Sequence, residues 1–273
     1  MPELPEVEVL RRSLEPRLGG RRIERVEVLA PALREPLDRR ALRRLEGRRV
    51  VDLRRRSKYL LVDIEEGATL VLHLGMSGRL TLVPAATERE PHEHLAFGLD
   101  SGERLRFRDP RRFGVAFVAP TARLDLDPHF ARLGREPLEP PIGGAELAEL
   151  AAGRRRPVKS FLMDGGRIVG VGNIYATEAL HRAGIRPDRS VARLGAERWE
   201  RLAAAVVEVL EQAIRQGGTT LNDFTDGAGN AGYFQVALAA YGRAGESCPR
   251  CGGTIRRLVQ AGRSSFYCPR CQR

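Results

Sequence analysis

The sequence predicts an α+β protein: an N-terminal helix, an antiparallel β-sandwich domain, a hinge, a helical second domain and a cysteine-rich end. Three observations lead to this prediction. Short apolar runs separated by glycines fill residues 21–118. Longer segments with apolar residues at helical spacing fill residues 146–216. All four cysteines lie in the last 26 residues, so the chain ends in a small element of its own.

The first element is a helix that starts within MPELPE. Proline at position 2 suits a first helical turn, because its missing N–H is not needed there. Glu3 and Glu6 complement the positive end of the helix dipole. The apolar residues that follow recur every three or four positions: Val7, Leu10, Leu14 and Leu18. Taken alone, these residues need no interpretation beyond a well-started helix.

The β-rich region contains eight short runs that favour a sandwich or barrel: RIERVEVLA, RRVVDLRRR, KYLLVDIEE, ATLVLHLGM, GRLTLVP, LAFGLDSG, ERLRFRD and GVAFVAP. Residues 119–145 are rich in proline and glycine and are expected to form a hinge. The expected domains are therefore residues 1–118, a helical domain at 146–243 and a terminal element at 244–273.

The cysteines form the pattern C-x2-C-x16-C-x2-C. This spacing is typical of a zinc site with four thiolate ligands, which leaves no open position for substrate. We therefore expect one structural zinc ion in a zinc-finger hairpin, bound by Cys248, Cys251, Cys268 and Cys271. The surrounding arginines fit a hairpin that grips a phosphate backbone, and they equally fit a purely stabilising zinc knuckle.

The charge of the chain indicates a polyanionic partner. The net charge is +11 and the isoelectric point is near 10.4, and 44 of the 46 basic residues are arginine, which clamps phosphate in a bidentate manner. Only Lys58 and Lys159 are lysines. No apolar stretch is long enough to span a membrane and no signal peptide is apparent, so a cytoplasmic location is expected.

Eight motifs follow one another along the chain: MPELPEVE, RRRSKYLLV, HLGMSGRL, HEH, FRDPRRFG, GVGNIYATEALHRAGI, GGTTLNDF…GNAGYFQ and SSFYCPRC. In this order they resemble the motifs of bacterial formamidopyrimidine-DNA glycosylases, which are base-excision repair enzymes for oxidised purines. The resemblance covers essentially the whole chain. It implies a helix–two-turn–helix element in the helical domain.

The resemblance also implies the residues that carry out catalysis. After removal of Met1, the secondary amine of Pro2 attacks C1′ of the damaged nucleotide, and Glu3 serves as general acid and base. Glu6 assists the geometry near the amine, and Lys58 contacts phosphate and helps β-elimination. Arg263 of the zinc hairpin holds phosphates and is associated with δ-elimination. The acidity of an α-amino group supports the first role, since it titrates roughly two pK units below lysine.

The DNA-binding residues follow from the same resemblance. Met76, Arg111 and Phe113 fill the space left by an extruded base, and the other DNA contacts are His92, Arg154, Lys159 and Asn173. Residues 217–234 resemble a lid over the extruded purine. Two departures are Gly165–Gly166, where a polar amide side chain is often found, and Ser265, where threonine is common.

The expected function is excision of 8-oxoguanine and formamidopyrimidines from double-stranded DNA by a nucleoid-associated bacterial monomer, followed by β,δ-elimination. One alternative is an endonuclease VIII-like enzyme for oxidised pyrimidines. Leu4 argues against it, because that branch usually has glycine there, as does the complete lid motif. Another is a zinc-ribbon DNA-binding protein without catalysis, which leaves the MPELPE start unexplained.

Overall fold

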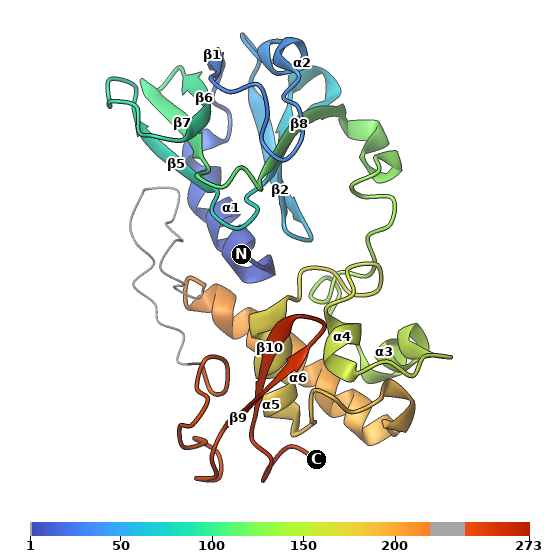
Figure 1. Cartoon of the computed structure of the whole chain (residues 1–273). Helices are drawn as coiled ribbons and strands as arrows, with labels where there is room; N and C mark the ends of the chain where they lie inside the picture. The colour runs from blue at the N-terminus through green and yellow to red at the C-terminus, as the bar shows by residue number, and fades with distance from the viewer. Residues whose placement is uncertain (1, 219–237) are drawn as a thin grey trace. The chain divides into compact units, whose positions relative to one another are not determined.

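The computed structural model describes residues 2–218 and 238–273 (Figure 1). The described residues divide into two compact units. One contains residues 2–131 with Gly217 and Gly218, and the other contains residues 132–216 and 238–273. The division after Ala131 falls inside the segment 119–145 that the sequence predicts as a hinge.

The first unit is a helix packed on two antiparallel sheets that share one hydrophobic core. One sheet has the strand order β1-β6-β7-β5 and the other β2-β3-β4-β8. The strands are β1 (Ile23–Val28), β2 (Val50–Arg56), β3 (Tyr59–Ile64), β4 (Ala68–His73), β5 (Arg79–Pro84), β6 (Glu93–Leu99), β7 (Glu103–Arg108) and β8 (Val115–Pro120). All eight predicted runs form strands, and their buried apolar residues pack into the shared core.

Helix α1 (Leu4–Leu18) contributes to this core the four residues that the sequence predicts: Val7, Leu10, Leu14 and Leu18. It packs against β2 and β3. The short α2 (Arg39–Arg43), which the sequence pattern did not predict, is capped by Asp38, whose carboxyl accepts the backbone N–H groups of Arg40 and Ala41. Two 3₁₀ turns, η1 (Glu65–Gly67) and η2 (Thr121–Leu126), complete the unit.

The second unit is helical and carries the C-terminal hairpin. Its helices are α3 (Gly144–Ala151), α4 (Val158–Leu162), α5 (Asn173–Ala183) and α6 (Ala196–Arg215), with a 3₁₀ turn η3 (Val191–Arg193). Helix α6 packs on α3 and α5 around a second hydrophobic core. Strands β9 (Arg256–Gln260) and β10 (Arg263–Tyr267) form the hairpin between the two cysteine pairs.

The predicted fold class is confirmed, with one helix added in the second unit. The short α4 was not expected, because its five residues follow three arginines and a proline and show no helical period of useful length. Among the described residues, no helix combines the length and the apolar character needed to cross a lipid bilayer.

Candidate active site

The start of α1 holds Pro2 and Glu3 at the beginning of the described chain. Pro2 is partly exposed, whereas Glu3, the residue that caps the helix, has only 3% of its surface exposed. The Glu6 carboxyl accepts the backbone N–H of Glu3 at 2.7 Å. This bond fixes the backbone next to Pro2.

Arg55 connects α1 to the turn that carries Lys58, and sequence reasoning missed it. Its buried guanidinium lies 3.4 Å from the Glu8 carboxyl and donates a hydrogen bond of 3.0 Å to the Ser57 carbonyl oxygen. One turn further along α1, Arg11 donates to the carbonyl of Leu53. The helix therefore runs antiparallel to β2, and this register directs its Pro2 end toward the turn at residues 57–58.

Lys58 follows Ser57, whose φ of 57° makes a tight turn between β2 and β3. Burial and the positive charge of Lys58 lower the pKa of His73 on β4. Together with the positive charges of Arg34 and His129, these effects bring this pKa to about 4. The Nδ1 atom of His73 accepts the backbone N–H of Gly75 at 3.0 Å. His73 is therefore neutral at pH 7, and it supports the loop in which Met76 lies.

Met76, Arg111 and Phe113, which are proposed to fill the space left by an extruded base, are called the wedge residues below. They lie on two neighbouring loops of the first unit. Met76 is 44% exposed and Phe113 is 42% exposed, which is unusual for large apolar side chains. The Arg111 guanidinium carbon lies 4.6 Å from the centre of the Phe113 ring, a cation–π contact. The structure thus brings together the residues that the sequence groups, and it exposes them to solvent.

His92 is exposed and lies beside the same loops. It has a φ of 67°, and its carbonyl oxygen accepts the backbone N–H of Asp109 at 2.9 Å. Four of the predicted DNA-binding residues, Met76, His92, Arg111 and Phe113, therefore lie around one surface region of the first unit.

In the second unit, Lys159 differs from the expectation of a DNA contact. Its side chain is 2% exposed, and its ammonium group donates to the Ser264 carbonyl at 3.1 Å and to the Ser265 hydroxyl at 2.9 Å. Burial among these hairpin atoms makes Lys159 a support for the strand that begins with Arg263. Arg263 itself is exposed at the start of β10.

A polar cavity of about 340 Å³ lies next to this support, between α4 and the hairpin. Arg156, Asp164, Gln260 and Arg263 are among the residues that line it. Arg156 donates to the Asp164 carboxyl at 2.6 Å. Gly165, one of the two glycines that depart from the family pattern, also lines this cavity.

Asn173 is the first residue of α5, so its side chain lies beside the N–H groups at the start of the helix. Helix N-termini of this kind attract anions. Arg154 is partly exposed in the turn between α3 and α4. The lid segment 217–234 lies outside the described residues except for Gly217 and Gly218.

The four cysteines fit a zinc ion. Their sulfur atoms all lie within 4.8 Å of one another, with Sγ–Sγ distances of 3.8 Å between Cys248 and Cys271 and 3.4 Å between Cys251 and Cys268. A tetrahedron of Zn–S bonds of about 2.3 Å requires sulfur separations of roughly 3.8 Å. No disulfide links these cysteines. One structural zinc ion therefore belongs to this site.

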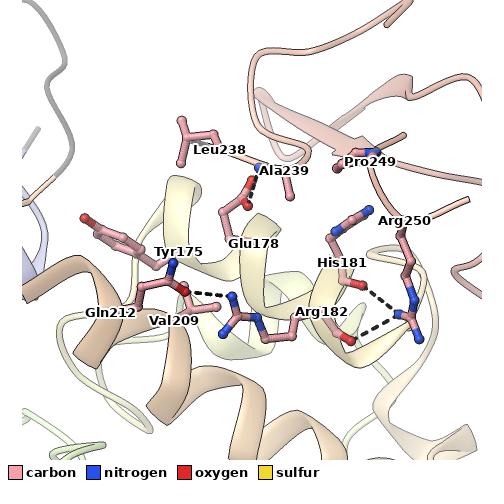
Figure 2. Close-up of a pocket in the computed structure, with 10 residues that line it drawn as sticks. All are labelled: Tyr175, Glu178, His181, Arg182, Val209, Gln212, Leu238, Ala239, Pro249 and Arg250. Carbon is pink, nitrogen blue, oxygen red and sulfur yellow. Dashed lines mark hydrogen bonds between the residues drawn. The ribbon is translucent and has the colours of Figure 1, made fainter. Parts of the chain in front are cut away.

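Polar contacts join the segment that carries the first cysteine pair to α5, and Figure 2 shows those of Arg250 and Glu178. Arg250 donates to the carbonyl oxygens of His181 and Arg182. The His181 Nε2 atom lies 3.3 Å from the Cys248 sulfur. The Glu178 carboxyl accepts the backbone N–H groups of three successive residues, 239–241, at 2.8–3.0 Å. Glu178, His181, Arg182 and Arg250 are among the residues that line a cavity of about 440 Å³.

Comparison with known proteins agrees with this geometry. Three family models match in order along the chain: the formamidopyrimidine-DNA glycosylase N-terminal domain at residues 1–116, the H2TH domain of the same enzymes at 133–225, and the zinc finger found in FPG and IleRS at 245–273. The H2TH match falls on the helical unit, as the resemblance implied.

Individual relatives extend over whole chains. The formamidopyrimidine-DNA glycosylase of Halorhodospira halophila is 50% identical over 277 residues, covering 100% of both chains. The structure of the MutM (Fpg) protein of Thermus thermophilus has a TM-score of 0.88 at 40% identity, covering 99% of this chain and 98% of that one. The Lactococcus lactis Fpg bound to DNA with an abasic site has a TM-score of 0.91 at 32% identity, covering 99% of each chain. The chain described here therefore belongs to the formamidopyrimidine-DNA glycosylase family.

Proposed function

We propose that Pro2, Glu3, Lys58 and Arg263 carry out the reaction of this chain. As a family member the chain is a bifunctional DNA glycosylase and AP lyase for damaged bases in double-stranded DNA. The observation that carries the assignment of residues is the register of α1 on β2. It directs a secondary amine and a buried carboxyl toward the turn with the lysine.

Pro2 is the nucleophile once Met1 has been removed. Its nitrogen forms a bond to C1′ of the damaged nucleotide while the bond from C1′ to the base breaks, and the base leaves with a proton. A secondary amine then yields an iminium ion that has no N–H proton to lose, so it remains an electron sink. An α-amino group titrates near 8, so at neutral pH more of it is free base than of a lysine, which titrates near 10.4.

Glu3 transfers the protons that ring opening requires, because its carboxyl follows directly after the nucleophile in the chain. In β-elimination a proton leaves C2′ and the bond from C3′ to the 3′ phosphate oxygen breaks. In δ-elimination a proton leaves C4′ and the bond from C5′ to the 5′ phosphate oxygen breaks. Lys58 and Arg263 hold these phosphates by their positive charges. Each elimination therefore expels a phosphate that is already neutralised.

DNA binding uses exposed side chains of both units. In the first unit Met76, Arg111 and Phe113 fill the gap left by the extruded base and offset the cost of unstacking it, while His92 contacts phosphate. In the second unit Arg154 and the Asn173 end of α5 contact phosphate. The zinc ion, held by Cys248, Cys251, Cys268 and Cys271, stabilises the hairpin that presents Arg263, and Lys159 supports the same hairpin.

The substrates proposed for this chain are oxidised purines, 8-oxoguanine and ring-opened formamidopyrimidines, and the chain works as a monomer in the bacterial cytoplasm. Three relatives named above support this choice, since their names refer to formamidopyrimidine or to Fpg. The Leu4 residue next to Glu3 also favours this branch over the endonuclease VIII-like branch.

The test is reductive trapping. Processed protein is incubated with an 8-oxoguanine:cytosine duplex and borohydride, and a covalent adduct is expected. Pro2→Gly and a variant that retains Met1 should give much less adduct. Pro2→Gly leaves only a primary amine in place of the secondary one, and retained Met1 turns the Pro2 nitrogen into an amide and moves the free amine one residue away. An adduct that forms only with thymine glycol would favour the pyrimidine enzyme. Binding without any adduct would favour a non-catalytic protein.

A further inference from the structure

Asp109, in the loop between β7 and β8, has a carboxyl group that the reaction does not use. The residue is completely buried. One carboxyl oxygen accepts the hydroxyl of Ser77 at 2.6 Å, and the other accepts the backbone N–H of Gly114 at 2.7 Å. A buried carboxyl that makes two short hydrogen bonds to two different loops is well placed to hold those loops together.

The Ser77 hydroxyl extends this connection to the wedge. Besides donating to Asp109, its oxygen accepts the backbone N–H of Arg111 at 3.2 Å. Ser77 follows Met76 in the chain, and Gly114 follows Phe113. Each of the three wedge residues is thus a partner of this small network or directly precedes one.

The main chain of Asp109 makes three more bonds. Its N–H donates to the carbonyl of His92 at 2.9 Å. Its carbonyl oxygen accepts the backbone N–H of Arg112 at 3.2 Å and lies 2.9 Å from the Nε2 atom of His94. The backbone position of His92, a proposed phosphate contact, therefore depends on the same residue as the wedge.

The two loops also touch directly, which leaves little room for either to move alone. Gly75 has a φ of +61°, and a Cβ atom added there would lie 2.4 Å from the carbonyl carbon of Phe113. At Gly114 an added Cβ would lie 2.9 Å from the carbonyl oxygen of His73, at the start of the Met76 loop, and 2.6 Å from the Phe107 ring. Only glycine permits this approach of the two backbones.

We propose that Asp109 is a positioning residue that, through Ser77, joins the Met76 loop and the Arg111–Phe113 loop into one rigid wedge. This inference rests on the proposed function, because a wedge matters only if a base is extruded. The neighbouring base pairs tend to close the gap. A loop held in place by buried hydrogen bonds resists that closure, whereas an untethered loop yields to it.

The test compares Ser77→Ala and Asp109→Asn with wild type in single-turnover excision of 8-oxoguanine. Alanine removes the bridging hydroxyl, and asparagine replaces one acceptor by an NH₂ donor. The control is Thr81→Ala, which removes a hydroxyl that accepts from Arg106 on the same sheet. Thr81 is also buried but has no bond to either wedge loop among the described contacts.

Two duplexes distinguish a loss of wedge positioning from a general loss of protein function. Opposite cytosine, Ser77→Ala should excise roughly tenfold more slowly, the effect of a lost buried hydrogen bond. Opposite an abasic analogue there is no pair to break, so the same variant should be within about twofold of wild type. Ser77→Thr, which keeps the hydroxyl, should recover the rate opposite cytosine. Trapping on single-stranded abasic DNA should be unchanged.

Equal slowing on both duplexes, or a Ser77→Ala rate opposite cytosine that equals wild type, would overturn the inference. Slowing of Thr81→Ala with the same dependence on the opposite base would do so too. If the wild-type protein excised no lesion from either duplex, that result would contradict the proposed function itself. It is seen without any variant, so it is distinguishable from a failure of the inference about Asp109.

Discussion

The guanidinium of Arg55, with 4% of its side chain exposed, lies 3.4 Å from the Glu8 carboxyl, which is 9% exposed. Arg55 lies near the end of β2 and Glu8 lies on α1, so this contact joins two elements that meet only in the folded chain. Burial alone raises the pKa of Glu8, but hydrogen bonds from Arg11 and Arg12 and the charge of Arg55 lower it overall. The charged Glu8 thereby anchors the helix that begins with the proposed nucleophile.

Replacing Arg55 by methionine should disturb catalysis more than stability. Glu8 keeps Arg11 and Arg12, so we expect a loss of about 2 kcal/mol in unfolding free energy, less than for a fully orphaned buried charge. The Ser57 carbonyl loses its donor, so the Lys58 turn shifts and trapping on abasic DNA should slow about tenfold. The control is Arg54→Met, which lies on the same strand as Arg55 and loses an ion pair with Asp63 on β3. Equal trapping rates for the two variants would contradict the coupling.

Lys159→Met should alter the products rather than the binding of DNA. The ammonium supports Ser264 and Ser265, which follow Arg263, so its loss should misplace Arg263 and reduce the fraction of strands that undergo δ-elimination. β-Elimination and zinc content should change little. Gel analysis of the 3′ ends measures the ratio. Arg257→Met removes an exposed bond to Ser264 and serves as control. A Lys159→Met variant with weakened DNA binding and an unchanged product ratio would instead support a direct DNA contact.

Removing zinc should loosen the end of α5 as well as the hairpin. Arg250, which lies between Cys248 and Cys251 in the chain, donates to the carbonyl oxygens of His181 and Arg182, and Gln272 donates to the carbonyl of Ile185. With a chelator we expect faster hydrogen exchange in residues 183–185 and 256–267, because four-thiolate zinc sites supply folding energy directly. Exchange in the β2-β3-β4-β8 sheet should not change. Uniform acceleration over both units would refute this local role.

The elements with strong periodic patterns were predictable from the sequence, and the long-range polar contacts were not. The α1 face of Val7, Leu10, Leu14 and Leu18 repeats at helical spacing, and the cysteine spacing specifies a zinc site by itself. Asp109 looks like an ordinary turn residue before proline, and Lys159 looks like one more surface cation. Their roles depend on Ser77 and Ser265, partners 32 and 106 positions away, and such pairings come only from tertiary packing.

His73 makes stability depend on pH in the acidic range. Its pKa is about 4 in the folded chain against 6.5 for an ordinary histidine. The unfolded state binds the proton more tightly, so folding loses stability as pH falls from 6.5 to 4, by roughly 3 kcal/mol in total. In His73→Asn an amide oxygen can still accept the Gly75 N–H without titrating. Urea unfolding across this range should therefore show that the unfolding free energy of the variant falls less with decreasing pH than that of wild type. An identical dependence on pH in both proteins would exclude His73 as a source of the acid loss.

His129, stacked on Phe117 at 4.7 Å between ring centres, should show the opposite dependence. Burial lowers its pKa, but hydrogen bonds to Asp127 and Glu35 and their negative charges raise it overall. The folded state therefore binds the proton more tightly. The stability from this group is complete below the ordinary pKa of 6.5 and is lost as pH rises through the raised folded value. His129→Gln should remove this alkaline loss, so the difference in unfolding free energy between wild type and variant should shrink from pH 6 to pH 9. A difference that stays constant over that interval would mean that His129 stabilises the fold by packing on Phe117 alone, without its charge.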